Sequence, residues 1–236
     1  MYTFLWPFAY IIKYFFPENK NPNDYNDLIY FDFETTGLNP YHDKIIEYSF
    51  IQEENESYDL NDEESYKHNT FITDLVNPMK KFEKKITDIT GIHPDELEEK
   101  TDINTHILNI MNFINYDMNN KNIYLIAHNG DSFDKLFLLE AIKKYNISEN
   151  KNLEYEHIYF IDSLNLCKKL LPNIKSYSLK NITKYFNINP GTHRAMSDTI
   201  ALRELYHHLT TLLAKEMNIN HIYLLDTPSI VYDYLY

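Results

Sequence analysis

The order of strand-like and helix-like segments is the feature that most constrains the fold of this chain. Three runs rich in apolar, β-branched and aromatic residues come first, at 28–34, 44–51 and 70–76. Further along, strand-like runs at 122–129 and 157–162 alternate with segments of helical periodicity. Three strands followed by alternating strands and helices are typical of an α/β domain with a mixed sheet.

Helices are expected where apolar residues recur at spacings of three and four, and Pro172 should end one of them. The expected ranges are 107–114, 133–145, 164–171, 178–186 and 195–216. The tail, 221–236, is expected to add a strand or a packing segment. We assign 1–26 to an apolar N-terminal segment and linker, 27–216 to the main domain, and 217–236 to a C-terminal packing segment.

The N-terminal stretch MYTFLWPFAYIIKYFF is apolar on every side of a helical wheel. Pro7 and Lys13 interrupt it, it is shorter than the roughly 20 residues that a membrane span needs, and it lacks the basic start of a signal peptide. We expect it to dock on the main domain or on a protein partner, with membrane attachment as the alternative. Cys167 is the single cysteine, which excludes an internal disulfide and favours a reducing compartment, cytoplasmic or nuclear.

The formal net charge of −13 argues against strong binding to nucleic acid. The charge is unevenly spread, however. Residues 53–64 hold seven acids and no base, whereas Lys80, Lys81, Lys84 and Lys85 lie close together. A local basic surface therefore remains compatible with the acidic total, and predicts modest, salt-sensitive binding. We interpret 53–64 as a solvated loop, with repulsion of long or duplex substrates as the alternative.

The strongest chemical signal is FDFETTGL, at the end of the first strand-like run. Because side chains alternate across a strand, Asp32 and Glu34 point to one face. Two neighbouring carboxylates repel each other, and a divalent cation such as Mg²⁺ removes the conflict. The alternative is that one acid caps a backbone turn and the other is solvated. Gly37 is expected to supply backbone geometry that other residues resist.

Two further acids occur in suggestive contexts. Asp134 follows a strand in IAHNGDSFD, with the alternative that Asp131 or Ser132 caps a helix and Asp134 only favours its positive end. Asp198 lies one turn after the small Ala195 in GTHRAMSDTIALREL. His193 precedes that helix and could act as a solvent-facing base, or be an ordinary surface histidine.

Together these motifs resemble those of a known enzyme family. The order D-x-E-x-T-G, H-N-x-x-x-F-D and H-x-A-x-x-D is similar to the DEDDh branch of the DnaQ-like 3′–5′ exonucleases. The similarity extends over about residues 27–210. The segments AHNGDSFD and KSYSL resemble the three-prime repair exonucleases more than the polymerase proofreading subunits.

The resemblance implies a ribonuclease H-like fold, with a five-stranded mixed sheet flanked by helices, and hydrolysis that releases nucleoside 5′-monophosphates. It also implies two Mg²⁺ ions, for which Mn²⁺ can substitute. Asp32, Glu34 and Asp198 would hold the first ion, and Asp32 would bridge to the second, which Asp134 reaches through water. His193 would be the general base, so activity should fall on the acid side as it protonates.

Substrate contacts follow from the same resemblance. The turn after the first acids would hold the terminal nucleotide through Thr35, Thr36 and Leu38, with Leu38 against the last base. The alternative for Leu38 is a buried turn residue. His128 and Asn129 would lie beside the scissile phosphate.

The expected substrate is the 3′ end of single-stranded nucleic acid, with DNA favoured. An exoribonuclease that trims RNA 3′ ends is an alternative, because nothing in the sequence reveals whether the 2′-hydroxyl is sensed. A third hypothesis is a non-catalytic binding scaffold derived from a nuclease. The presence of all five chemical positions argues against it.

Overall fold

The computed structural model describes residues 27–53, 69–114, 122–153, 155, 157–225 and 227–236. The predictions for the apolar N-terminal segment and for most of the acidic segment, 54–64, lie outside the described residues. Among the described helices, none combines the length and the apolar character that crossing a membrane requires.

The core of the fold is a five-stranded mixed sheet with the order β3-β2-β1-β4-β5. β1 pairs antiparallel with β2 and parallel with β4, and β4 pairs parallel with β5. All five strands were predicted, with ends that differ by at most two residues. Their bounds are β1 Asp27–Thr35, β2 Ile45–Glu53, β3 Asn69–Leu75, β4 Ile123–Ala127 and β5 Ile158–Asp162.

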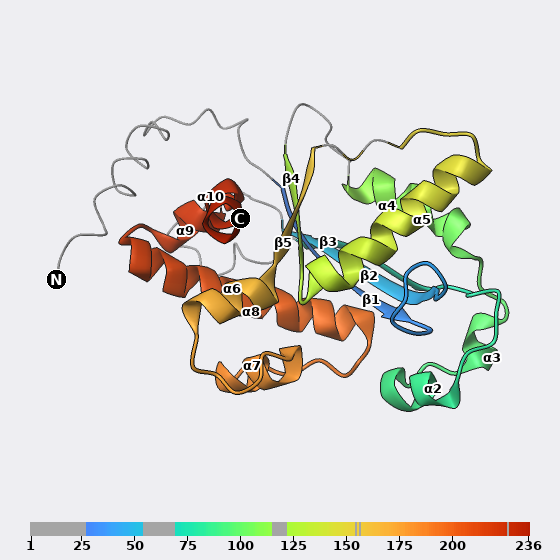
Figure 1. The fold of residues 1–236 in the computed structure, drawn as a ribbon, viewed down its shortest axis with the longest axis horizontal. Helices are drawn as coiled ribbons and strands as arrows, with labels where there is room; N and C mark the ends of the chain where they lie inside the picture. The colour runs from blue at the N-terminus through green and yellow to red at the C-terminus, as the bar shows by residue number, and fades with distance from the viewer. Residues whose placement is uncertain (1–26, 54–68, 115–121, 154, 156, 226) are drawn as a thin grey trace.

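Helices cover both faces of this sheet (Figure 1). All five predicted helices are present, as α4 to α8, and α2 and α3 add short turns after β3. Their bounds are α2 Lys84–Thr90, α3 Pro94–Leu97, α4 Ile103–Ile114, α5 Asp134–Ser148, α6 Ser163–Leu170, α7 Leu179–Tyr185 and α8 Ala195–Met217.

The alternation of β1 divides its side chains between two cores. Ile29, Phe31 and Phe33 pack in the core that contains α4 and α5. Leu28 and Tyr30 pack in the other core, which contains the buried face of α8. The same alternation directs the next even-numbered side chains of β1 toward α8.

The tail forms two helices, so the predicted option of an added strand is wrong. α9 (His221–Leu225) and α10 (Pro228–Leu235) follow α8. Leu224, Ile230 and Val231 are buried in the core that α8 shares with the sheet. Tertiary packing thus overrides the strand preference of these aromatic and branched residues.

Candidate active site

The carboxyl end of β1 carries Asp32 and Glu34 on the face toward α8. A β-bulge between Glu34 and Thr35 ends the regular pairing with β2. In the turn that follows, the Thr36 N–H donates to the Lys44 carbonyl at 2.8 Å. Asp32 and Glu34 therefore sit where the strand stops and its backbone opens.

Gly37 has a different role from the one predicted. Its φ is not in the left-handed region, where Gly91 is the one described glycine. A Cβ on Gly37 would instead collide with the carboxylate of Asp43. That carboxylate accepts hydrogen bonds from the Thr36 hydroxyl at 3.3 Å and from the Asn39 N–H at 3.0 Å. Close approach, not unusual backbone geometry, explains this glycine.

Asp134 is the first residue of α5 and is buried, with 2% of its surface exposed. Its Oδ1 accepts the backbone N–H of Phe33 at 3.1 Å, which ties it to β1 between the first two acids. The alternative in which Asp131 or Ser132 caps this helix is wrong, because the N-cap residue is Phe133 and no side chain caps the helix.

Asp198 lies in the first turn of α8 and is held by its surroundings. Its carboxylate accepts the Ser197 hydroxyl at 3.3 Å, and the same hydroxyl oxygen accepts the backbone N–H of Thr192 at 3.0 Å. A Cβ on Gly191 would collide with the Asp198 carboxylate, so only glycine allows this approach.

His193 is exposed and has a left-handed backbone with φ of 57°. One ligand atom each from Glu34, His193 and Asp198 lie within 4.8 Å of one another. The structure therefore brings Glu34 together with His193 and Asp198, which lie more than 150 residues further along the sequence.

Burial, and for Asp32 and Glu34 also the neighbouring acids, disfavours ionisation of the carboxyls in this cluster. Burial, then Asp134, Glu34 and Asp198, raise the pKa of Asp32 well above its usual value. Burial, then Asp198 and Glu47, raise the pKa of Glu34 to about 8. Burial raises the pKa of Asp134 to about 7, and burial also raises the pKa of Asp198. Several like charges thus converge without enough cationic side chains to balance them.

This donor set matches a hard divalent cation. Carboxylate oxygens are the ligands that Mg²⁺ and Mn²⁺ prefer, and a cation would offset both the burial and the repulsion that raise these pKa values. Asp32, Glu34 and Asp198 are the residues that could hold one ion, and Asp32 with Asp134 a second.

Two charged residues beside the cluster were not predicted as part of the site. Glu47 on β2 is buried and lies directly opposite Glu34 in the strand register. Arg194 forms an ion pair with it at 2.7 Å. The sequence signal for Glu47 was an acid inside the apolar run IIEYSFI. Its position opposite Glu34 depends on the pairing register of β1 and β2, which a single sequence does not fix.

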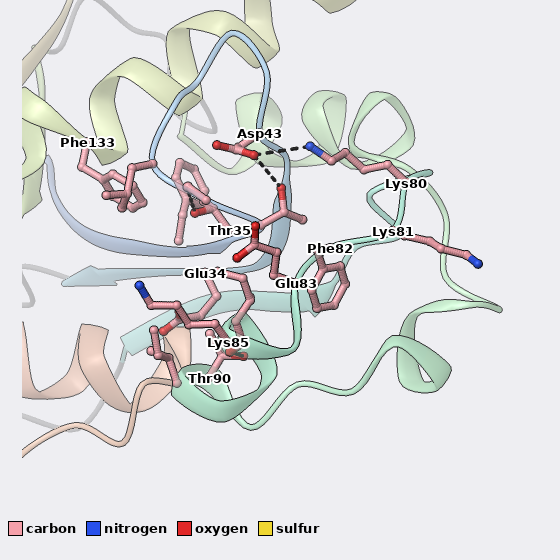
Figure 2. A pocket seen from close by; sticks show the side chains of 16 residues that line it. Glu34, Thr35, Asp43, Lys80, Lys81, Phe82, Glu83, Lys85, Thr90 and Phe133 are labelled. Atoms are coloured by element: carbon pink, nitrogen blue, oxygen red, sulfur yellow. Dashed lines mark hydrogen bonds and ion pairs between the residues drawn. The ribbon is translucent and has the colours of Figure 1, made fainter.

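A cavity of about 600 Å³ opens next to Glu34 (Figure 2). The turn from Thr35 to Leu38 lines one side of it, and the segment from Lys80 to Thr90 lines the other. Leu38 is 82% exposed there, so the alternative of a buried turn residue is wrong. Thr35 and Thr36 are buried, and their hydroxyls donate to the Gly37 carbonyl at 2.6 Å and to Asp43.

His128 and Asn129 do not line this cavity. Both ring nitrogens of His128 have internal partners, the Ser163 hydroxyl at 2.8 Å and the Tyr177 carbonyl at 2.6 Å. Burial lowers the pKa of His128, in keeping with a neutral ring. Asn129 is exposed, and its backbone N–H donates to Asp162 at 2.9 Å. Their contact with phosphate stays a prediction, and the structure gives His128 no free donor for it.

A family model described as exonuclease, RNase_T, matches residues 29–206. The chain belongs to this exonuclease family. Its domain is a DnaQ-like 3′–5′ exonuclease, a hydrolase of a metal-dependent family, as the motifs predicted.

Curated relatives are DNA polymerases III of PolC type. That of Mycoplasma genitalium is 32% identical over 213 residues, which cover 89% of this chain and 13% of the relative. That of Bacillus subtilis is 33% identical over 176 residues, 73% of this chain and 11% of the relative. The chain thus spans about one eighth of these relatives. The finer resemblance to three-prime repair exonucleases stays a prediction.

Solved structures of Escherichia coli exonuclease I share the fold. One, in complex with a dT13 oligonucleotide, has a TM-score of 0.62 at 17% identity and covers 89% of this chain and 43% of its own. Another, a zinc-bound complex with single-stranded DNA, has a TM-score of 0.61 at 18% identity and covers 81% and 41%. The predicted ribonuclease H-like fold is confirmed by this likeness and by the mixed sheet.

Proposed function

We propose that the chain removes nucleoside 5′-monophosphates from the 3′ end of single-stranded DNA. The observation that carries the proposal is the gathering of Glu34, Asp198 and the exposed His193 within 4.8 Å, beside the mutually repelling Asp32 and Asp134. The choice of DNA is supported by the relatives, which are DNA polymerases, and by exonuclease I, whose structure contains single-stranded DNA.

Two Mg²⁺ ions would neutralise the four carboxylates and polarise the oxygens of the scissile phosphate. His193 takes the proton from a water whose oxygen attacks phosphorus. The bond from phosphorus to the 3′-oxygen of the preceding nucleotide breaks, and that oxygen takes a proton from solvent. Because the His193 ring is exposed while its backbone is fixed ahead of α8, it can pass its proton on to bulk water.

The cavity beside Glu34 is the place for the terminal nucleotide. Its volume of about 600 Å³ lies in the usual range of small-molecule pockets. Leu38 from the turn and Ile89 from α2 line it and are 82% and 45% exposed, which leaves apolar surface on which a base can stack. The Thr36 N–H already donates to Lys44, so it is not available to the 3′-hydroxyl.

The test is digestion of a 5′-labelled single-stranded DNA, with matched RNA and blunt duplex DNA alongside. With Mg²⁺ we expect stepwise shortening from the 3′ end, fastest on single-stranded DNA. EDTA and the Asp32→Ala variant should abolish it. Lys100→Gln is the matched control, because it removes an exposed ion pair with Asp74 at 3.1 Å and leaves the cluster unchanged.

Three outcomes contradict the proposal. An intact DNA strand with Mg²⁺ would refute the activity. Equal shortening by Asp32→Ala and the unaltered chain would refute the site. Faster shortening of RNA would refute the choice of substrate.

A further inference from the structure

Glu47 is a buried acid that the proposed chemistry does not use. It lies on β2, directly opposite Glu34 on β1, and 5% of its surface is exposed. Residues opposite each other on antiparallel strands have neighbouring side chains, so Glu47 adds a fifth carboxylate beside the four of the site. Such an acid needs either a bound cation or a cationic side chain.

Arg194 supplies that charge through a two-pronged contact. Its Nη2 donates to Oε1 of Glu47 at 2.7 Å, and its Nε lies 3.0 and 3.1 Å from the two carboxylate oxygens. The planar guanidinium matches a carboxylate in this way, which the ammonium of a lysine cannot do. Glu47 is thus committed to a protein partner.

The second oxygen of Glu47 also binds the start of α8. Oε2 accepts the backbone N–H of Ala195 at 2.9 Å. This amide is among the first N–H groups of the helix, which have no partner within it, and a negative charge is favourable at that end. A single carboxylate on β2 therefore holds both the side chain of residue 194 and the backbone of residue 195.

These two residues directly follow His193. Its left-handed φ of 57° is uncommon for a residue that is not glycine and persists only where the surroundings fix it. On one side of His193, Glu47 fixes the chain. On the other, the Thr192 N–H donates to the Ser197 hydroxyl at 3.0 Å, and that hydroxyl donates to Asp198 at 3.3 Å. The turn that carries His193 is thus held by Glu47 on one side and, through Ser197, by Asp198 on the other.

We infer that Glu47 and Arg194 are positioning residues, which together hold the imidazole of His193 and the first turn of α8 against the end of β1. The pair acts through His193 and does not contact the substrate or hold the metal. The inference rests on the proposed function for its kinetic arm only.

A double-mutant cycle tests this role. Glu47→Gln should lower kcat about tenfold or more, because small displacements of a catalytic group are costly, and leave the KM for single-stranded DNA nearly unchanged. In a His193→Ala background the same change should alter kcat by less than about twofold, because the group it positions is gone. A loss of equal factor in both backgrounds would mean a general structural role and would overturn the inference.

Conservative replacement sharpens the test at Arg194. Arg194→Lys keeps the charge but not the fork, so its kcat should lie between those of the unaltered chain and Arg194→Met. Equal activity of all three would overturn the inference. A titration with Mn²⁺ should give the same stoichiometry for Glu47→Gln as for the unaltered chain, and the loss of one ion would assign Glu47 to the metal site instead.

Amide hydrogen exchange gives a readout that needs neither metal nor activity. In metal-free protein, Glu47→Ala removes the acceptor of the Ala195 N–H, so the peptide around residues 192–198 should exchange faster. Lys100→Gln should leave that peptide unchanged. An unaltered rate in Glu47→Ala would overturn the inference. If the chain degrades no DNA at all, the proposed function fails, and the exchange measurement still decides the positioning role.

Discussion

Glu34 and Glu53 lie at opposite ends of the β1–β2 pair, across from Glu47 and Leu28 respectively. Both are partly buried, yet their pKa values move in opposite directions. Burial, then Asp198 and Glu47, raise the pKa of Glu34 to about 8. Burial acts to raise the pKa of Glu53 too, but hydrogen bonds and charge from His207 and Tyr30 bring it below its usual value.

The difference lies in where the balancing charge comes from. At the Glu53 end the chain supplies its own donors, His207 Nε2 at 2.8 Å and the Tyr30 hydroxyl at 2.7 Å. At the Glu34 end the neighbours are mostly other acids, and positive charge must come from outside. We infer that Glu53, whose partners lie within the chain, stabilises the fold. The acids around Glu34, which have too few cationic partners, are suited to bind a cation.

The largest expected effect comes from removing an acid at the Glu34 end. Asp32→Asn should reduce exonuclease activity by about a thousandfold, since Asp32 is the ligand that we propose both metal ions share. The same change should raise the melting temperature of the metal-free protein by several degrees, because a repelled carboxyl is gone. Digestion assays and thermal melts in EDTA check both. A variant that is both active and less stable would break the comparison.

The next effect is on the pH dependence of stability. Glu34 and Asp134 have folded pKa values of about 8 and 7, above their unfolded values, so the folded protein binds more protons over this range. The metal-free protein should therefore lose stability as pH rises from about 4 to 8, with no further loss from these groups above that.

Mg²⁺ should reverse the trend, because the ligands must be deprotonated to bind it. The stabilisation by Mg²⁺ should thus grow between pH 5.5 and 8. Thermal melts with Mg²⁺ and with EDTA at several pH values measure it. A metal-free melting temperature that rises steadily through this window would contradict the assigned shifts.

The sequence was sufficient for the parts of the site that depend on local periodicity. Alternation alone placed Asp32 and Glu34 on one face of β1, and the structure puts that face toward α8. The sequence could not predict the tie between Asp134 and Phe33, because it joins residues 101 positions apart. Glu47 was missed for a similar reason, since its meaning depends on the register of β2 with β1 and on the bulge after Glu34.

Glu53→Gln tests the self-sufficient end. It weakens charge-assisted hydrogen bonds to His207 and Tyr30, so unfolding free energy should fall by about 1–3 kcal/mol. Because the folded pKa of Glu53 is depressed, this contribution is present at neutral pH and is lost as pH falls through the folded pKa. Exonuclease activity should stay within about twofold. Denaturant unfolding and digestion assays check it, and a large loss of activity without a loss of stability would contradict the comparison.

The smallest expected effect concerns the basic side of the cavity at the Glu34 end. Lys80 pairs with Asp43 at 3.3 Å, whereas Lys85 has no ion pair within the described part of the chain. Figure 2 shows Lys85 among the lining residues, with Lys81 pointing away. Lys85 thus has no carboxylate partner among the described residues, and it lines the cavity beside Glu34. This arrangement fits a substrate whose phosphates contact Lys85 while bound metal neutralises the acids.

Lys85→Gln should therefore raise the KM for single-stranded DNA about threefold, leave kcat unchanged and reduce the salt dependence of KM by about one phosphate contact. Lys84→Gln is the matched control, because the neighbouring Lys84 is paired with Asp88 and does not line the cavity. Steady-state kinetics over a salt series measure both variants. Equal effects of Lys85→Gln and Lys84→Gln on KM would mean that only the net charge of the protein affects DNA binding. That result would contradict a specific role for Lys85 beside Glu34.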